Sequence, residues 1–365
     1  MNWYSVNNID TIDSPALLLY RERIQKNINS AVEMIEDVNL LRPHIKTNKI
    51  SEVCAMLMAA AITKFKCATI AEAEMLAMLH AKDVLLAYQP VGPKTKRLLS
   101  LVQQYPQTTF SCVIDNMDTA KILSELFSGS NEMINVFIDL NTGMNRSGIK
   151  PSKAFELFQQ LNLLPGIHFK GLHAYDGHLR DTDLHQRQQK SDTAFNEVIE
   201  LASQIEKTIN KPITIVAGGS PTFPTHIKRN IECSPGTFVF WDWGYKHQLP
   251  DEKFDYAALV LTRVISIVDD QTITTDLGHK SVAAENPFPR VHFLNAPDVM
   301  PISQSEEHLV LKVTDSSQFK VGDVLYGVPV HICPTVALYD KAVVVENKQA
   351  VSTWRVLARD RKINL

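Results

Sequence analysis

An alternation of short apolar runs with amphipathic segments extends from Ala16 to about Ala217 and constrains the fold more than any other feature of the sequence. Each run has the length and composition of a buried strand, and helical periodicity or a turn follows it. Strands joined through helices pair in parallel, so the alternation predicts a parallel α/β sheet. The eight expected strands are residues 16–20, 40–44, 65–69, 84–88, 109–114, 135–140, 168–173 and 213–217.

Eight such βα units close naturally into a (β/α)8 TIM barrel. An open, doubly wound sheet fits the same alternation, because the alternation predicts parallel pairing but not closure. The chain has 365 residues, more than the roughly 250–300 that a single core supports, so a second domain is expected beside the barrel.

The pattern changes from about Thr237, where helical periodicity fades. Strand-like runs separated by Asp, Gly, Pro and Ser clusters follow, at residues 257–268, 308–313 and 341–345. These runs predict a C-terminal β-rich domain. The barrel is therefore expected over residues 14–243 and the β-rich domain over residues 244–365, to which residues 1–13 are expected to add a strand.

The charge and the cysteine content favour a protein whose ligands or substrates are small molecules. The formal net charge is −3 and no long basic run occurs, so neither nucleic acid nor a membrane surface is an expected partner. No apolar stretch reaches the roughly 18 residues that a membrane helix needs. The cysteines are odd in number and scattered, and the N-terminus lacks signal-peptide features, so a cytoplasmic location is expected. The cysteines are Cys54, Cys67, Cys112, Cys233 and Cys333.

Lys46 stands just past the end of the second expected strand, among several basic residues. A lysine held partly out of water beside Arg42, His44 and Lys49 is favoured in its uncharged, nucleophilic form. Such an amine condenses with a carbonyl, and the natural partner is an aldehyde cofactor such as pyridoxal phosphate. A solvated basic turn is the alternative interpretation.

Polar residues at the carboxyl ends of the expected strands are further candidates, because the loops there build the active site of a barrel. Thr69 closes the third strand, and Arg146 and Tyr175 follow the sixth and seventh. Tyr175 could donate its phenol to the cofactor's pyridine nitrogen, and Arg146 could reach the same ring or a substrate carboxylate. A rim tyrosine and a turn-capping arginine are the alternatives.

Gly218, Gly219 and Ser220 follow the last expected strand. Glycines let the backbone approach a ligand closely, and successive N–H groups with a hydroxyl supply donors for a phosphate. Residues 234–237, Ser-Pro-Gly-Thr, are a candidate for the other side of such a cradle. A Gly-Gly turn without a ligand is the alternative, so the position after the last strand carries this prediction.

His331 and Cys333 lie two residues apart in the second domain. In an extended chain such residues project from the same face, so an imidazole and a thiolate could hold one cation. Soft sulfur next to nitrogen favours zinc or a similar transition ion. An ordinary buried cysteine is the alternative.

Seven motifs stand in one order along nearly the whole chain: Ser14-Pro15-Ala16-Leu17, Arg42-Pro43-His44-Ile45-Lys46-Thr47, Cys67-Ala68-Thr69 with Glu72-Ala73-Glu74, Gly143-Met144-Asn145-Arg146-Ser147-Gly148, His173-Ala174-Tyr175-Asp176-Gly177-His178, Gly218-Gly219-Ser220 and His331-Ile332-Cys333-Pro334-Thr335. In these motifs the chain resembles the D-threonine aldolase and D-serine dehydratase family, the pyridoxal-phosphate lyases with an alanine-racemase-type fold. Seven collinear motifs are far more specific than any one of them.

The resemblance implies an alanine-racemase-like barrel joined to a β-rich domain, assembled as a homodimer. It implies that Lys46 binds pyridoxal 5′-phosphate covalently and that His331 and Cys333 bind a divalent metal, zinc or manganese. The cofactor-binding residues are expected to be Lys46, His44, Thr69, Arg146, Tyr175, Gly218, Gly219 and Ser220. The chain departs from the family at Asn48, where members usually carry His, so any contact made by that histidine is not expected here.

The resemblance also implies a lyase that acts on a D-3-hydroxy amino acid. Dehydratases of the family pair His with Cys, as this chain does, whereas aldolases tend to place Asp second. We therefore expect a dehydratase of the D-serine or D-threo-3-hydroxyaspartate type, which yields a 2-oxo acid and ammonia. The alternatives are a D-threonine aldolase, an amino-acid racemase and a non-enzymatic pyridoxal-phosphate carrier.

Overall fold

The structure, a computed structural model, describes residues 2–365 and divides into two compact units. We call them the barrel unit and the β-rich unit. The barrel unit comprises residues 31–46, 54–236 and 360–365, and the β-rich unit comprises residues 2–30, 47–53 and 237–359. Within the described chain, no helix has both the length and the apolar character needed to cross a bilayer.

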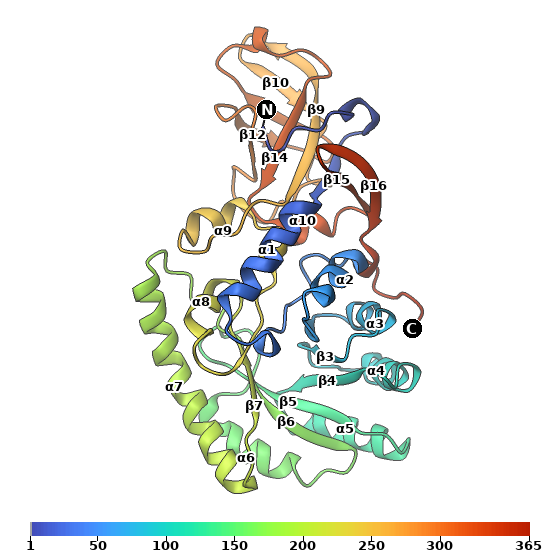
Figure 1. Ribbon diagram of the computed structural model, residues 1–365, viewed down its shortest axis with the longest axis vertical. Coiled ribbons are helices and arrows are strands. Elements are labelled where there is room, and N and C mark those ends of the chain that lie inside the picture. The colour runs from blue at the N-terminus through green and yellow to red at the C-terminus, as the bar shows by residue number, and fades with distance from the viewer. Residues whose placement is uncertain (1) are drawn as a thin grey trace. The chain divides into compact units, whose positions relative to one another are not determined.

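A seven-stranded parallel sheet forms the centre of the barrel unit, with its strands in the order in which the chain visits them (Figure 1). Residues 41–44 close it: Leu41 bridges Cys233 in the last strand, and His44 bridges Lys66 in the first. The sheet is therefore a ring of eight parallel segments, which confirms the barrel and excludes the open sheet. Its strands are β2 (Lys64–Cys67), β3 (Asp83–Leu86), β4 (Thr109–Ile114), β5 (Ile134–Leu140), β6 (Ile167–Ala174), β7 (Thr214–Ala217) and β8 (Glu232–Cys233).

Two of the eight expected barrel strands are wrong. β1 (Ala16–Tyr20) is a strand, but it pairs with β9 and β15 of the β-rich unit. Residues 40–44 form no regular strand, because a 3-10 helix ends at Leu40 and only single bridges follow. A fully buried apolar run predicts a strand but not the sheet that it joins, and β8, with two residues, is too short to show any periodicity.

Helices follow the barrel strands and lie along the outside of the sheet (Figure 1). Their starts are fixed locally: the side chains of Thr69, Asn116 and Asp183 each accept a hydrogen bond from the first turn of their helix, which satisfies backbone donors that would otherwise lack partners. The helices of the chain up to this point are α1 (Arg21–Met34), α2 (Ser51–Ala59), α3 (Ile70–Met78), α4 (Pro93–Gln104), α5 (Met117–Gly129), α6 (Pro151–Leu161), α7 (Leu184–Ile209) and α8 (Phe223–His226).

The β-rich unit is built on a mixed nine-stranded sheet in the order β12-β13-β10-β9-β1-β15-β16, with β14 paired to β9 and β11. The twelve-residue β9 pairs with three other strands and organises the sheet. Its elements are β9 (Ala258–Asp269), β10 (Thr272–Thr275), β11 (Val291–Phe293), β12 (Met300–Gln304), β13 (Leu309–Lys312), β14 (Val324–Pro329), β15 (Lys341–Glu346) and β16 (Gln349–Arg355), with α9 (Trp243–Gln248) and α10 (Ile332–Val336).

Residues 2–13 contribute side chains to this unit, and the expected strand does not form there. Tyr4, Val6 and Ile12 are buried in one cluster with residues of β1, β9 and β14. The strand that the N-terminal part adds is β1 instead, three residues further on. Residue 1 of the expected segment lies outside the described residues.

Candidate active site

Lys46 follows the segment that closes the barrel and is partly exposed, whereas Ile45 before it is fully buried. The backbone of this segment is held on both sides: His44 N donates to Pro235 O at 2.9 Å, and Ile45 N donates to Lys66 O at 2.9 Å. The structure therefore places Lys46 at the end of a well-fixed barrel segment, as the sequence predicted.

Arg42 was expected to be a cationic neighbour of Lys46, but its side chain is buried in ion pairs. Its guanidinium donates to Glu232 at 2.6 Å and to Asp83, the first residue of β3, at 2.7 Å. Both carboxylates raise the pKa of Arg42 against the opposing effect of burial. Arg42 therefore holds strands together, and its charge is already compensated.

A second lysine, Lys66, points into the barrel from β2 and was not predicted from the sequence. It is 1% exposed, donates a hydrogen bond to Ser234 Oγ, and its Nζ lies 3.5 Å from His173 Nε2. Burial, with the charge of Lys46 second, lowers its pKa to about 7. The available signal was a lysine flanked by Phe65 and Cys67 in a strand that is otherwise apolar.

His173 and Asp139 form a buried pair next to Lys66. His173 Nδ1 lies 2.7 Å from Asp139 Oδ1, and Ser147 donates to the other carboxylate oxygen at 3.1 Å. Burial lowers the pKa of His173. Burial alone would raise the pKa of Asp139, but the hydrogen bond from His173 holds it below its ordinary value. The neutral imidazole therefore donates from Nδ1, which leaves Nε2 as an acceptor facing Lys66.

Tyr175 lies between two cations and a glycine. Lys66 Nζ is 5.4 Å and Arg146 Cζ 5.1 Å from the centroid of the Tyr175 ring. A Cβ on Gly219 would come within 2.8 Å of the ring, so only glycine allows this approach. Arg146, His173 and Tyr175 also line one small cavity. The structure thus brings together three of the predicted sites: Arg146, Tyr175 and the glycine turn.

The glycine turn after β7 contacts the loop that was predicted to face it. Ser234 N donates to Gly218 O at 2.9 Å, and Gly236 N donates to Ser220 Oγ at 3.3 Å. Gly218 has a φ of +72°, which side chains rarely adopt. A Cβ on Gly236 would lie 2.5 Å from the carbonyl oxygen of His44. The two loops and residue 44 therefore pack with no room for larger residues.

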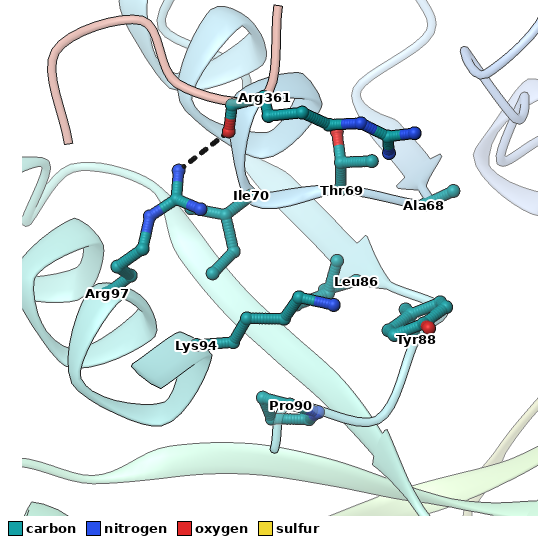
Figure 2. A pocket seen from close by; sticks show the side chains of 9 residues that line it. All are labelled: Ala68, Thr69, Ile70, Leu86, Tyr88, Pro90, Lys94, Arg97 and Arg361. Atoms are coloured by element: carbon teal, nitrogen blue, oxygen red, sulfur yellow. Dashed lines mark hydrogen bonds between the residues drawn. The ribbon is translucent and has the colours of Figure 1, made fainter. Parts of the chain in front are cut away.

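Thr69 has a different setting. Its hydroxyl accepts from Glu72 N at 3.1 Å and caps α3. It lines a cavity of about 330 Å³, and the side chains of Lys94, Arg97 and Arg361 line the same cavity (Figure 2). Figure 2 shows Lys94 reaching toward Tyr88, with its Nζ 4.5 Å from the ring centroid. Between residues 2 and 365, no hydrogen bond joins the Thr69 side chain to Lys46 or Tyr175, so its predicted contact with the cofactor stays a prediction.

The predicted metal ligands lie in the β-rich unit, at the start of α10. His331 is the residue before this short helix and Cys333 lies within it, so the expected extended strand is wrong. The two side chains nevertheless interact, because Cys333 contributes to raising the pKa of His331. His331 Nδ1 lies 2.6 Å from Glu285 Oε1, and Cys333 Sγ lies 3.1 Å from Thr47 Oγ1.

This donor set suits a soft cation, because an imidazole and a thiol come together with hydroxyls beside them. Burial lowers the pKa of His331, but Cys333, Asp242 and Glu285 outweigh it and raise the pKa to about 9. Across residues 2–365, no three His, Cys, Asp or Glu side chains converge closely enough to hold a metal by themselves. A cation held by His331 and Cys333 would therefore keep positions open for water or substrate.

Comparison with known proteins agrees with this architecture. The family model described as "Alanine racemase, N-terminal domain" matches residues 20–242, and the model described as "Putative serine dehydratase domain" matches residues 257–345. The chain belongs to the alanine racemase N-terminal domain family. The family match spans the barrel and the loops that carry Lys46, Arg146, Tyr175 and Gly219.

Similar proteins of this family cover nearly the same length. A D-threonine aldolase from an Arthrobacter species is 26% identical over 95% of this chain and 93% of its own. A D-threo-3-hydroxyaspartate dehydratase from Delftia sp. (strain HT23) is 23% identical over 95% and 98%. The crystal structure of D-threonine aldolase from Filomicrobium marinum has a TM-score of 0.87, with 25% identity and 95% of each chain covered. The relatives' names include both aldolases and dehydratases, so they do not separate the two reactions.

Proposed function

We propose that the protein is a lyase that uses pyridoxal phosphate and a divalent metal to act on D-3-hydroxy amino acids, with Lys46 holding the cofactor covalently. The observation that carries the proposal is Lys46 itself: a partly exposed amine at the end of a buried barrel segment. The backbone of that segment is hydrogen-bonded to the backbone of Lys66. The Lys66 side chain contacts His173, and His173 in turn contacts Asp139.

The residues present fit pyridoxal phosphate. Gly219 lacks the Cβ that would press on the Tyr175 ring, a Cβ on Gly218 would approach His226, and the hydroxyl of Ser220 follows the two glycines. Glycines and a hydroxyl in this arrangement suit a phosphate, and a tyrosine ring suits the edge or face of a pyridine ring. When bound, pyridoxal phosphate withdraws electrons from the carbon that bears the amino group and so weakens the bonds to that carbon.

The side chains of the barrel unit supply the remaining steps. The amine of Lys46 removes the α-proton on the face that it occupies, which selects one enantiomer. Arg146, an exposed residue that lines the small cavity with His173 and Tyr175, would bind the substrate carboxylate. Asp139 holds the His173 ring in one orientation. The position of the imidazole therefore stays fixed while the substrate reacts.

His331 and Cys333 would hold the metal, zinc or manganese, which would stabilise negative charge on the substrate's β-oxygen. Glu285 accepts from His331 Nδ1, so Nε2 would be the imidazole nitrogen left to hold the metal. Cys333 would supply a soft sulfur donor, which supports zinc over magnesium or calcium.

We propose elimination of the β-hydroxyl, a dehydratase reaction, because Cys rather than Asp stands at position 333. The second candidate is retro-aldol cleavage, which the names of the aldolase relatives favour. Racemisation would need a second base on the opposite face of the cofactor, and a non-enzymatic carrier would leave the β-rich unit without a role.

Product analysis tests the proposal. The purified protein, with cofactor and zinc or manganese, is incubated with D-threonine, D-serine and their L-enantiomers. We expect 2-oxobutyrate and ammonia from D-threonine, and no turnover of the L-enantiomers. Glycine and acetaldehyde would establish the aldolase instead, and loss of optical activity without other products would establish a racemase. A lack of reaction with every D-3-hydroxy amino acid would contradict the lyase.

We also propose that the protein works as a homodimer in the cytoplasm. Light scattering on the purified cofactor-bound protein should give twice the 41.0 kDa of one chain. A monomer at micromolar concentration would contradict the dimer.

A further inference from the structure

Lys66 is a lysine at a place where a charge is costly. It lies on β2 between two buried residues, Phe65 and Cys67, and its own side chain is almost completely inaccessible. Among the residues that the structure describes, none forms an ion pair with Lys66. A buried ammonium without a carboxylate in direct contact loses its hydration and regains only the attraction of more distant charges.

The hydrogen-bond partners of Lys66 accept from either form of the amine. Ser234 Oγ is a hydroxyl, and His173 Nε2 is the acceptor side of a neutral imidazole fixed by Asp139. An ammonium and a free amine both donate, so neither partner requires the charge. Lys66 can therefore gain or lose a proton without breaking its contacts.

The charged groups around Lys66 act in both directions. Lys46 and Arg42 disfavour the ammonium, and Asp176 and Asp139 favour it. With burial as the largest effect, the balance leaves the pKa of Lys66 at about 7. Near neutral pH the side chain is thus close to half protonated, and a single additional charge nearby would decide its state.

We propose that Lys66 is a titrating counter-cation of the barrel, partly an uncharged amine when no anionic ligand is bound and an ammonium when an anionic ligand lies against Tyr175. This inference rests on the proposed function, because it takes the anionic ligand to be pyridoxal phosphate. The proton comes from solvent and adds to Nζ, and no other bond forms or breaks at Lys66. Lys66 is accordingly a positioning residue, which supplies a cation only when the cofactor's negative charge is present.

The size of the effect depends on how near the ligand's charge comes to Lys66, whose Nζ lies 5.4 Å from the Tyr175 ring centroid. A negative charge that came within ~4–6 Å of Nζ would raise the pKa of the amine by about 1–3 units. A midpoint that moves from about 7 to above 8 means that roughly half a proton per site is taken up on cofactor binding near pH 7.5.

Calorimetry of cofactor binding measures this proton. Pyridoxal phosphate is titrated into the cofactor-free protein at pH 7.5 in several buffers of different ionisation enthalpy, and the slope of the observed enthalpy gives the protons taken up. Other groups contribute to the slope, so the quantity is the difference between proteins. We expect the wild type to take up about half a proton more than either Lys66→Met or Lys66→Arg.

The two variants differ in charge and agree in having no group that titrates near pH 7. A structural defect has no reason to shift both by the same amount. Lys82→Met is the matched control, because Lys82 is an exposed lysine just before β3, and it should take up as many protons as the wild type. The visible absorbance of the bound cofactor shows that each protein is loaded.

Lysine ¹³Cε NMR gives a second readout that does not depend on turnover. The cofactor-free wild type should show one lysine signal with a midpoint near 7, absent from Lys66→Met, and the midpoint should move above 8 with cofactor bound. A signal that titrates near 10 in both states would overturn the inference and leave the proposed function intact. A wild type that shows no visible band with pyridoxal phosphate would overturn both.

Discussion

Replacing Arg42 with methionine should weaken the barrel where residues 41–44 close it. The Arg42 guanidinium is 1% exposed and pairs with Glu232 on β8, which neighbours this segment, and with Asp83 on β3, one strand beyond the neighbouring β2. Methionine keeps much of the volume but leaves both carboxylates without this partner. Removing one member of a buried ion pair costs about 3–5 kcal/mol, because the remaining charge stays buried.

The structure places the Arg42→Met cost at the lower end of that range. The Asp83 side chain is 20% exposed and can recover hydration, and Glu232 keeps Lys64 as a second partner. We therefore expect a loss of about 3 kcal/mol in local stability. That loss corresponds to hydrogen exchange about a hundredfold faster at the backbone amides that exchange through opening of this segment.

Native-state hydrogen exchange with mass spectrometry measures this locally, which matters because a two-unit chain need not unfold in one transition. Peptides that contain residues 41–46 and β8 should respond most, since Arg42 N donates to Cys233 O at 2.8 Å. Adding Glu232→Met to Arg42→Met should recover about 1–2 kcal/mol of local stability, because it removes the buried Glu232 carboxylate that has lost Arg42 as a partner. Lys64→Met, which removes a partly exposed partner, should cost less than about 1 kcal/mol. A change below tenfold in Arg42→Met would refute the reasoning.

Four further predictions concern the site. Lys46→Ala should abolish the visible absorbance band that appears with pyridoxal phosphate, while Lys82→Ala keeps it. Gly219→Ala should weaken cofactor binding about tenfold or more, because its Cβ would lie 2.8 Å from the Tyr175 ring, and fluorescence titration measures the loss. Asp139→Asn should lower stability at pH 7, and its difference from the wild type should shrink below about pH 4, because a depressed carboxyl pKa stabilises the fold only above the unfolded value. Chelation should abolish turnover in a way that zinc or manganese restores, and Cys333→Ala should weaken that restoration.

Each of these has a contrary result. Visible absorbance in Lys46→Ala would place the covalent bond elsewhere. Unchanged affinity in Gly219→Ala would mean that the cofactor does not depend on the packing of Tyr175. A stability difference for Asp139→Asn that stays unchanged as the pH falls well below 4 would mean that the carboxylate's charge is not what stabilises the fold. Full turnover after chelation would remove His331 and Cys333 from the mechanism.

The fold was predictable because its signal is periodic. Alternation over 200 residues predicted a parallel barrel followed by a β-rich region, and the structure and family confirm the barrel. The errors occur where periodicity has no information. The run at Ala16–Tyr20 is buried on both faces, so its composition does not indicate which of the two sheets it joins. The strand β8 is too short to show a period. The exact domain boundaries, 14–243 and the remainder, stay a prediction.

The candidate site was partly predictable from residue type at strand ends. Lys46, Arg146, Tyr175 and the Gly218 turn are where the loops of a barrel place them. Lys66 was missed because a lysine in the middle of a strand reads as an outward-facing residue, and only the structure shows it pointing inward to His173. Which of these residues contact cofactor stays a prediction, as does the metal site.

None of the five cysteines forms a disulfide, and four of them are fully buried. Burial raises the pKa of Cys112 and Cys233 to about 12, so neither is a reactive thiolate at neutral pH. Cys333 is the only one with appreciable exposure, and it is also the candidate metal ligand. A thiol-specific reagent on the native protein therefore reports on a single position, and protection of that position by zinc would reveal occupancy of the metal site without any substrate.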